Sequence, residues 1–167
     1  MFKKISALAV LAISASGAYA VDGTVTVSGN VSSATCTVTA SATTVTLPTV
    51  SKTSLATAGS TAGTTPWSVS VSSCSAATMN TFFEAGTTVN SNGRLINSGT
   101  AGNVDGQIVT STFGVVNIGA ANGSQGTTAV SVSSNAATQQ FYVRYYATGA
   151  ATAGTFTSSF TYTLVYS

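Results

Sequence analysis

Hydrophobic and polar residues alternate along much of the chain, with the period of two that is typical of β-strands. The alternation is longest between Gly154 and Ser167, where Thr or Ser fills most odd positions. The apolar even positions of this segment are Phe156, Phe160, Tyr162, Leu164 and Tyr166. The pattern predicts one strand with an apolar face, far longer than the usual ~5–6 residues. Because we expect no later segment to pair with it, its outer edge invites another strand.

A second alternating segment lies near the other end of the chain. Val21, Val25 and Val27 share one face of this segment, with Gly23 between them. Such a strand either folds back onto its own domain or inserts into the next copy. The second arrangement is heterologous and open, so it produces a fibre.

Shorter segments between these two predict the rest of the fold. Strands are expected over residues 29–38, 45–47, 67–71, 79–84, 107–118, 127–132 and 140–147. A helical turn or loop is expected over 50–58, and the Asn-Gly pairs at 92–93 and 122–123 predict turns. Many short strands with Gly, Asn and Ser between them indicate a single all-β sandwich domain.

Residues 1–20 are interpreted as a secretory signal peptide. Lys3 and Lys4 precede a short apolar run over 5–13, and Ala18-Tyr19-Ala20 supplies a small-residue cleavage site. The apolar run is much shorter than the ~20 residues of a membrane-spanning helix, so we expect no membrane span. The mature protein is expected to begin at Val21.

Charge is scarce and balanced once the signal peptide is removed. The mature cations are Lys52, Arg94 and Arg144, and the acids are Asp22, Glu84 and Asp105. The sequence therefore offers no basic patch for nucleic acid. A neutral surface rich in Thr and Ser suits close packing against identical copies.

Cys36 and Cys74 form an even pair in an exported chain, which predicts a disulfide joining two early strands. The chain has no histidine, and none of its acids or serines lies in a catalytic motif. We therefore expect neither an enzyme nor a metal or other cofactor site.

Four features in order resemble the chaperone–usher pilus subunits, the type 1-like fimbrial proteins, over essentially the whole mature chain. They are the run 23–31 followed by Cys36, Val45-Thr46-Leu47-Pro48 before Cys74, the run 141–149, and an ending with Gly154 and the penultimate Tyr166. The resemblance implies an immunoglobulin-like β-sandwich that lacks its final strand. It divides the chain into a signal peptide (1–20), an N-terminal donor-strand extension (21–29) and a pilin domain (30–167).

The resemblance also implies how such a subunit assembles. A periplasmic chaperone lends a strand to the open groove, and at the outer-membrane usher the extension of an identical or related subunit replaces it. Val21, Val25 and Val27 would fill pockets of the groove, and Gly23 would lie where the backbone approaches closely. The groove and the chaperone-recognition surface would be formed by Gly154, Phe156, Phe160, Tyr162, Leu164 and Tyr166. The expected product is an extracellular fimbria that supports adhesion or biofilm formation.

A monomeric secreted sandwich, or a fimbrial tip adhesin that recognises carbohydrate, is the alternative. Trp67 and the tyrosines would then stack on sugar rings, although core packing is the expectation for Trp67 and Phe141. Arg144 is expected to be solvated or to make a cation–π contact rather than to bind a ligand. The donor pattern at 21–27 and the lack of room for a separate receptor-binding domain favour the fibre subunit.

Overall fold

The computed structural model describes residues 28–31 and 33–167, and residues 33–167 belong to one compact unit. The donor-strand residues Val21, Gly23, Val25 and Val27, like the signal peptide, lie outside the described residues. The elements in chain order are β1 (Thr37–Ala40), the 3-10 helix η1 (Lys52–Leu55), β2 (Thr61–Ser72), β3 (Thr78–Phe83), β4 (Val104–Thr110), β5 (Val130–Ser131), β6 (Ala137–Ala147) and β7 (Tyr162–Tyr166).

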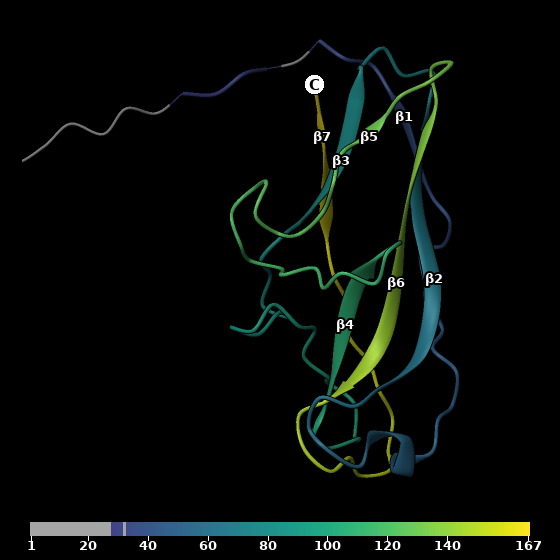
Figure 1. Ribbon diagram of the computed structural model, residues 1–167, viewed down its shortest axis with the longest axis vertical. Helices are drawn as coiled ribbons and strands as arrows, with labels where there is room; N and C mark the ends of the chain where they lie inside the picture. Colours follow the sequence, from purple (N-terminus) through teal and green to yellow (C-terminus); the bar gives the residue numbers. More distant parts are fainter. Residues whose placement is uncertain (1–27, 32) are drawn as a thin grey trace, which may run out of the picture. The chain divides into compact units, whose positions relative to one another are not determined.

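The strands form two antiparallel sheets (Figure 1). One sheet has the order β1-β2-β6-β4 and the other has the order β5-β3-β7. The prediction of an all-β sandwich is confirmed. β1 and β7 each lie at the end of their sheet and pair with one neighbour, β2 and β3 respectively.

The hydrophobic core lies between the inner faces of the two sheets. Alternate residues of the long strands point inward, so β2 contributes Trp67 and Val69, β6 contributes Phe141, and β3 contributes Phe83. The rings of Phe83 and Phe141 meet edge to face with centroids 5.1 Å apart, an arrangement that aromatic pairs prefer. The core therefore holds Trp67 and Phe141 as the sequence predicts, and Trp67 is not available as a sugar platform.

The Cys36–Cys74 disulfide forms as predicted. Cys36 directly precedes β1, and Cys74 follows the end of β2, whose Ser72 pairs with Thr37. The bond therefore fastens the edge strand β1 to the long strand β2.

The predicted turns and most of the predicted strands are present, with shifted ends. The strand expected over 29–38 is mostly wrong, because β1 begins only at Thr37, where pairing with β2 begins. Gly93 and Gly123 have positive φ values of 69° and 80°, as the Asn-Gly turns require. The helical turn expected over 50–58 is η1. Residues 45–47 do not form a strand. The strand expected over 107–118 ends at Thr110, because the chain turns there and the Thr110 N–H donates to the Gly114 carbonyl at 2.9 Å.

The prediction of one strand over 154–167 is wrong in extent, because only Tyr162–Tyr166 is a strand. Its partner β3 ends at Phe83, so the preceding residues 154–161 have no regular strand beside them. They are held instead by a loop, in which the N–H groups of Ser98 and Ala101 donate to the carbonyls of Thr157 and Thr155 at 2.8 and 3.0 Å.

Two buried glutamines hold the opposite edge of β3, where β5 is too short to pair along its whole length. The Gln139 side chain accepts from the Thr81 N–H at 2.8 Å. The Gln125 side chain accepts from the Phe83 N–H at 2.9 Å and donates to the Phe83 carbonyl at 2.7 Å. These amides satisfy backbone groups that would otherwise be buried without partners.

Candidate strand-accepting cleft

A cleft of about 640 Å³ opens between the segment that follows β1 and the segment that leads into β7. Its walls are mostly apolar or hydroxyl-bearing, and no charged residue lines it. The lining residues are Ala40, Ala42, Thr43, Thr44, Val45, Thr46, Leu47, Trp67, Leu95, Val143, Tyr145, Phe156, Thr157, Ser158, Ser159, Phe160 and Tyr162.

The two walls come from the two strands that end their sheets. On one side the chain leaves β1 and is held by Ser41, whose N–H donates to the Ser68 carbonyl at 2.8 Å. On the other side it approaches β7 through residues 156–161. Trp67 lies between the two walls, and its Nε1 donates to the Ala42 carbonyl at 3.1 Å, which fixes the ring and satisfies its polar atom.

The backbone of the C-terminal segment uses only alternate residues for pairing with its neighbours. The carbonyls that accept hydrogen bonds from the β3 side and from the loop belong to Thr155, Thr157, Ser159 and Thr161. In an extended chain the backbone groups of adjacent residues point to opposite edges. The N–H and C=O groups of the even-numbered residues therefore point to the free edge, where the cleft lies.

The side chains of the same even-numbered residues are incompletely covered. Along β3 every inward side chain is buried, whereas the inward side chains of the C-terminal segment are all only partly buried. Phe160 illustrates this, because its ring contacts Trp67 edge to face at 5.2 Å yet stays partly exposed. An apolar face that the fold leaves partly solvated gains free energy when a further apolar segment covers it.

Ser158 interrupts the apolar series at the middle of the cleft wall. Its Oγ is buried and has no hydrogen-bond partner in the described part of the chain. A buried hydroxyl without a partner costs free energy, so a group that entered the cleft with a donor or acceptor at this height would be favoured.

The structure separates the residues that the sequence assigned to one groove. Phe156, Phe160 and Tyr162 line the cleft. Leu164 and Tyr166 lie beyond it on β7 and pack against the core. Gly154 lies outside the cleft lining, against the loop backbone, where an added Cβ would come within 2.7 Å of the Ala101 Cα.

The wall opposite the C-terminal segment did not appear among the site residues expected from the sequence. Val45 and Leu47 supply its apolar side chains, and both are partly buried. The alternation Val45-Thr46-Leu47 was a usable signal, but it indicated a strand and did not indicate which surface the strand would face.

The cleft is an electrostatically neutral surface, because no charged residue lines it. Burial raises the pKa of the Tyr145 phenol above its ordinary value, and burial likewise raises the pKa of Tyr166 on β7. The raised pKa values keep both phenols in the neutral form at physiological pH. Within the described residues no cluster of metal-ligating side chains occurs, and no helix there is long and apolar enough to cross a bilayer.

Comparison with known proteins gives the same class of molecule. A family model described as "Fimbrial protein" matches residues 24–167. The major fimbrial subunit SMF-1 of Stenotrophomonas maltophilia (strain K279a) is 42% identical over 168 residues, which cover 94% of this chain and 99% of that protein. The F17 fimbrial protein of Escherichia coli is 36% identical over 167 residues, 93% of each chain.

A solved chaperone–usher pilus structure, described in connection with rod uncoiling, shares the fold. It has a TM-score of 0.61 at 16% identity and covers 87% of this chain and 96% of that one. The fold shared with that structure is two antiparallel sheets in an immunoglobulin-like arrangement. This chain belongs to the fimbrial protein family. It is a structural subunit of a surface fimbria, reaches the cell exterior through the periplasm and assembles with other subunits.

Proposed function

We propose that this subunit polymerises by donor-strand exchange, in which residues 21–28 of one copy enter the cleft of the next. The observation that carries the proposal is the direction of the even-numbered backbone groups beside the cleft. An entering strand pairs with those groups and covers the partly exposed rings of Phe156 and Phe160 at the same time.

The donor segment matches the cleft in chemistry. Its alternating valines, Val21, Val25 and Val27, supply apolar side chains on one face, while Asp22 lies on the other face. Each buried valine contributes at most ~1.5–3 kcal/mol, and each added ladder hydrogen bond contributes about 0.5–1.5 kcal/mol net. The receiving copy also completes its core, so assembly and subunit folding are coupled.

A periplasmic chaperone and an outer-membrane usher fit this scheme. A subunit with an open strand edge and partly exposed aromatic rings is prone to aggregate before it meets the next copy. A chaperone that occupies the cleft prevents this, and the usher exchanges that strand for the donor segment. The polymer then supports adhesion or biofilm formation indirectly.

The division of the chain follows from the same scheme. We assign residues 1–20 to the signal peptide, 21–29 to the donor extension and 30–167 to the pilin domain. In this assignment Gly23 faces a part of the cleft with no space for a side chain.

The experiment substitutes one residue on each face of the donor segment. Gly23→Trp should abolish fibre formation while chaperone binding persists, because the chaperone contacts the cleft and not the extension. Thr24→Trp is the matched control, because residue 24 points away from the cleft and its fibres should form. Normal fibres from Gly23→Trp would show that Gly23 has been assigned the wrong place.

A further inference from the structure

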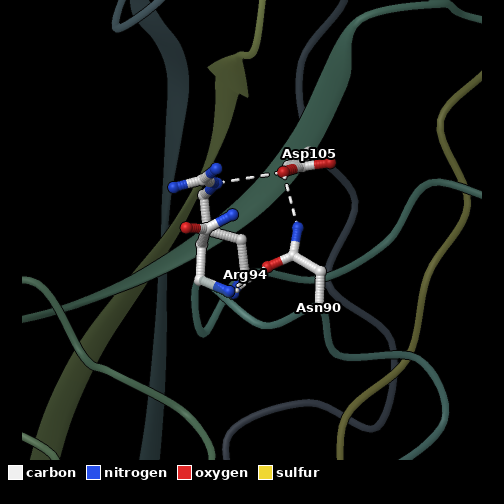
Figure 2. Close-up of polar contacts among 4 residues, drawn as sticks. Asn90, Arg94 and Asp105 are labelled. Atoms are coloured by element: carbon white, nitrogen blue, oxygen red, sulfur yellow. Dashed lines mark hydrogen bonds and ion pairs between the residues drawn. The ribbon is translucent and has the colours of Figure 1, made fainter.

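The few charges of the domain are unevenly paired. The structure describes five charged side chains, which are Lys52, Glu84, Arg94, Asp105 and Arg144. Arg94 and Asp105 satisfy each other, with 2.9 Å between Nε and Oδ2. Asn90 donates to the same carboxylate oxygen at 2.8 Å, as Figure 2 shows. This pair is therefore neutral within its own subunit.

Arg144 has no such partner. It lies on the outer face of the four-stranded sheet, between Tyr142 and Tyr146 along β6. Its Nε donates to Gln107 Oε1 at 2.9 Å, and among the described residues no carboxylate lies within ion-pair distance of it. The cation–π contact in this region belongs to Arg94, which lies 4.3 Å above the Tyr146 ring.

An exposed aromatic ring lies on Tyr142, the residue next to Arg144 on the same face of β6. Phe113 stacks on Tyr142 with ring centroids 5.0 Å apart and an interplanar angle of 16°. Phe113 is 53% exposed, has a φ of 62°, and lies near Val115, which is 50% exposed. A bulky residue with positive φ is strained, so the fold holds this ring at the surface against a local cost.

The opposite outer face carries the complementary charge. Glu84 follows Phe83 at the end of β3, so its side chain is on the outer face of the three-stranded sheet. Its carboxylate accepts from Thr163 Oγ1 at 2.6 Å, and the described residues place no cation beside it. Val165, on the same face of β7, is 36% exposed.

We propose that the Arg144 face of one copy docks on the Glu84 face of another copy. The two faces point in opposite directions from one sandwich, so the contact is heterologous and repeats from copy to copy. The charges are complementary, and each face also carries an exposed apolar side chain that the contact would cover, Phe113 on the Arg144 face and Val165 on the Glu84 face. The inference rests on the proposed function in one respect: polymerisation by donor-strand exchange holds neighbouring copies at high local concentration. It describes a lateral contact that is separate from the cleft.

A charge exchange tests the contact in assembled fimbriae. Arg144→Glu and Glu84→Arg should each reduce lateral association of copies several-fold, measured by low-speed sedimentation and by fibre width and bundling in electron micrographs. The double variant, which restores opposite charges across the contact, should recover most of the association. Added NaCl should weaken the association of the natural protein, because exposed pairs are screened.

Lys52→Glu is the matched control for Arg144→Glu, since it makes the same change in net charge on η1 and should leave association close to the natural level. If a charge reversal prevents folding, Arg144→Gln and Glu84→Gln replace it, and each should weaken association. A double variant no better than the single variants would overturn the proposal, as would single variants that associate normally.

Two further experiments separate the lateral contact from donor-strand exchange and from glycan binding. Deletion of residues 21–28 from the otherwise natural sequence tests donor-strand exchange alone, and we expect it to abolish the fibres. Fibres that survive this deletion would refute donor-strand exchange and leave the lateral contact standing. Binding of a sialylated oligosaccharide that needs Arg144 and ignores Glu84 would assign this face to an acidic glycan and overturn the proposal.

Discussion

Truncation of Phe160 separates the stability of the empty subunit from the stability of the filled one. The ring contacts Trp67 and Phe83 with centroids 5.2 and 5.7 Å away, but it lines the cleft and is only partly buried. Removing a fully buried phenylalanine side chain costs about 3–5 kcal/mol. The ring is mostly but not fully covered in the empty subunit, so we expect roughly two-thirds of that cost, about 2–3.3 kcal/mol.

A donor segment in the cleft changes this cost. Once the ring is fully covered, Phe160→Ala loses the whole contribution, and the difference of about 1–1.7 kcal/mol weakens donor binding by roughly 5–20-fold. The assay combines urea unfolding of a subunit lacking residues 21–28 with titration of a peptide covering Val21–Val31. Urea gives the loss in the empty subunit, and the titration gives the loss in affinity.

The matched control is Phe141→Ala, because Phe141 is 1% exposed and lies outside the cleft lining. It should lower stability more than Phe160→Ala and leave peptide affinity within about twofold, a change of ~0.4 kcal/mol. Ile108→Val, at a fully buried position, serves the same purpose if Phe141→Ala does not fold. Equal peptide affinity in Phe160→Ala and the natural domain would refute the reasoning, because the ring would then have no part in receiving the donor.

Three further predictions concern the domain itself. Gln125→Leu should lower the free energy of unfolding by about 1–3 kcal/mol for each group of Phe83 left unpaired, measured by urea unfolding; unchanged stability would mean that water replaces the amide at no cost. Gly154→Ala should lower the melting temperature because its Cβ meets the loop backbone, whereas Gly86→Ala, with only one side-chain atom 3.8 Å away, should be neutral or slightly stabilising; equal melting temperatures would show that the loop yields. Burial raises the pKa of Tyr145, so the folded state holds the phenol proton to a higher pH than the unfolded state does. The stability present below about pH 10 should therefore be lost as pH rises through the folded pKa, measured as the free energy of unfolding against pH. If the free energy of unfolding falls as steeply with pH in Tyr145→Phe as in the natural protein, this prediction is wrong.

The fold was readable from the sequence because the two-residue period specifies which side chains face the core. The period does not specify hydrogen-bond partners. Residues 154–161 keep the alternation of a strand, yet they are held by a loop because β3 stops at Phe83. Local pattern therefore predicted the faces of this segment correctly and its pairing incorrectly.

For a similar reason, only one of the two walls of the cleft could be predicted from the sequence. Phe156, Phe160 and Tyr162 were expected because the C-terminal alternation is long and unusually aromatic. Val45 and Leu47 form the facing wall only because the tertiary fold brings their segment, which follows β1, opposite residues 156–162. A short alternating segment does not indicate which distant segment of the chain will pack against it.

Contacts between distant residues were the least predictable. The Gln125 amide reaches Phe83 over a sequence separation of 42, and nothing around Gln125 marks it as buried. The charge pairing shows the same limit. Arg144 was the arginine singled out for a cation–π contact, but Arg94 makes it, because the turn after Asn90 carries Arg94 over Tyr146.

The central claim is that the cleft receives a strand from another copy, and complementation in trans measures this directly. A subunit lacking residues 21–28 is mixed with the Val21–Val31 peptide, and its melting temperature is recorded against peptide concentration. At about 100 times the dissociation constant the peptide adds ~2.7 kcal/mol, which corresponds to roughly 5–11 °C for a domain of this size. A peptide carrying Gly23→Trp should give no such rise. A truncated subunit that already unfolds cooperatively and whose melting temperature does not respond to the natural peptide would contradict the account.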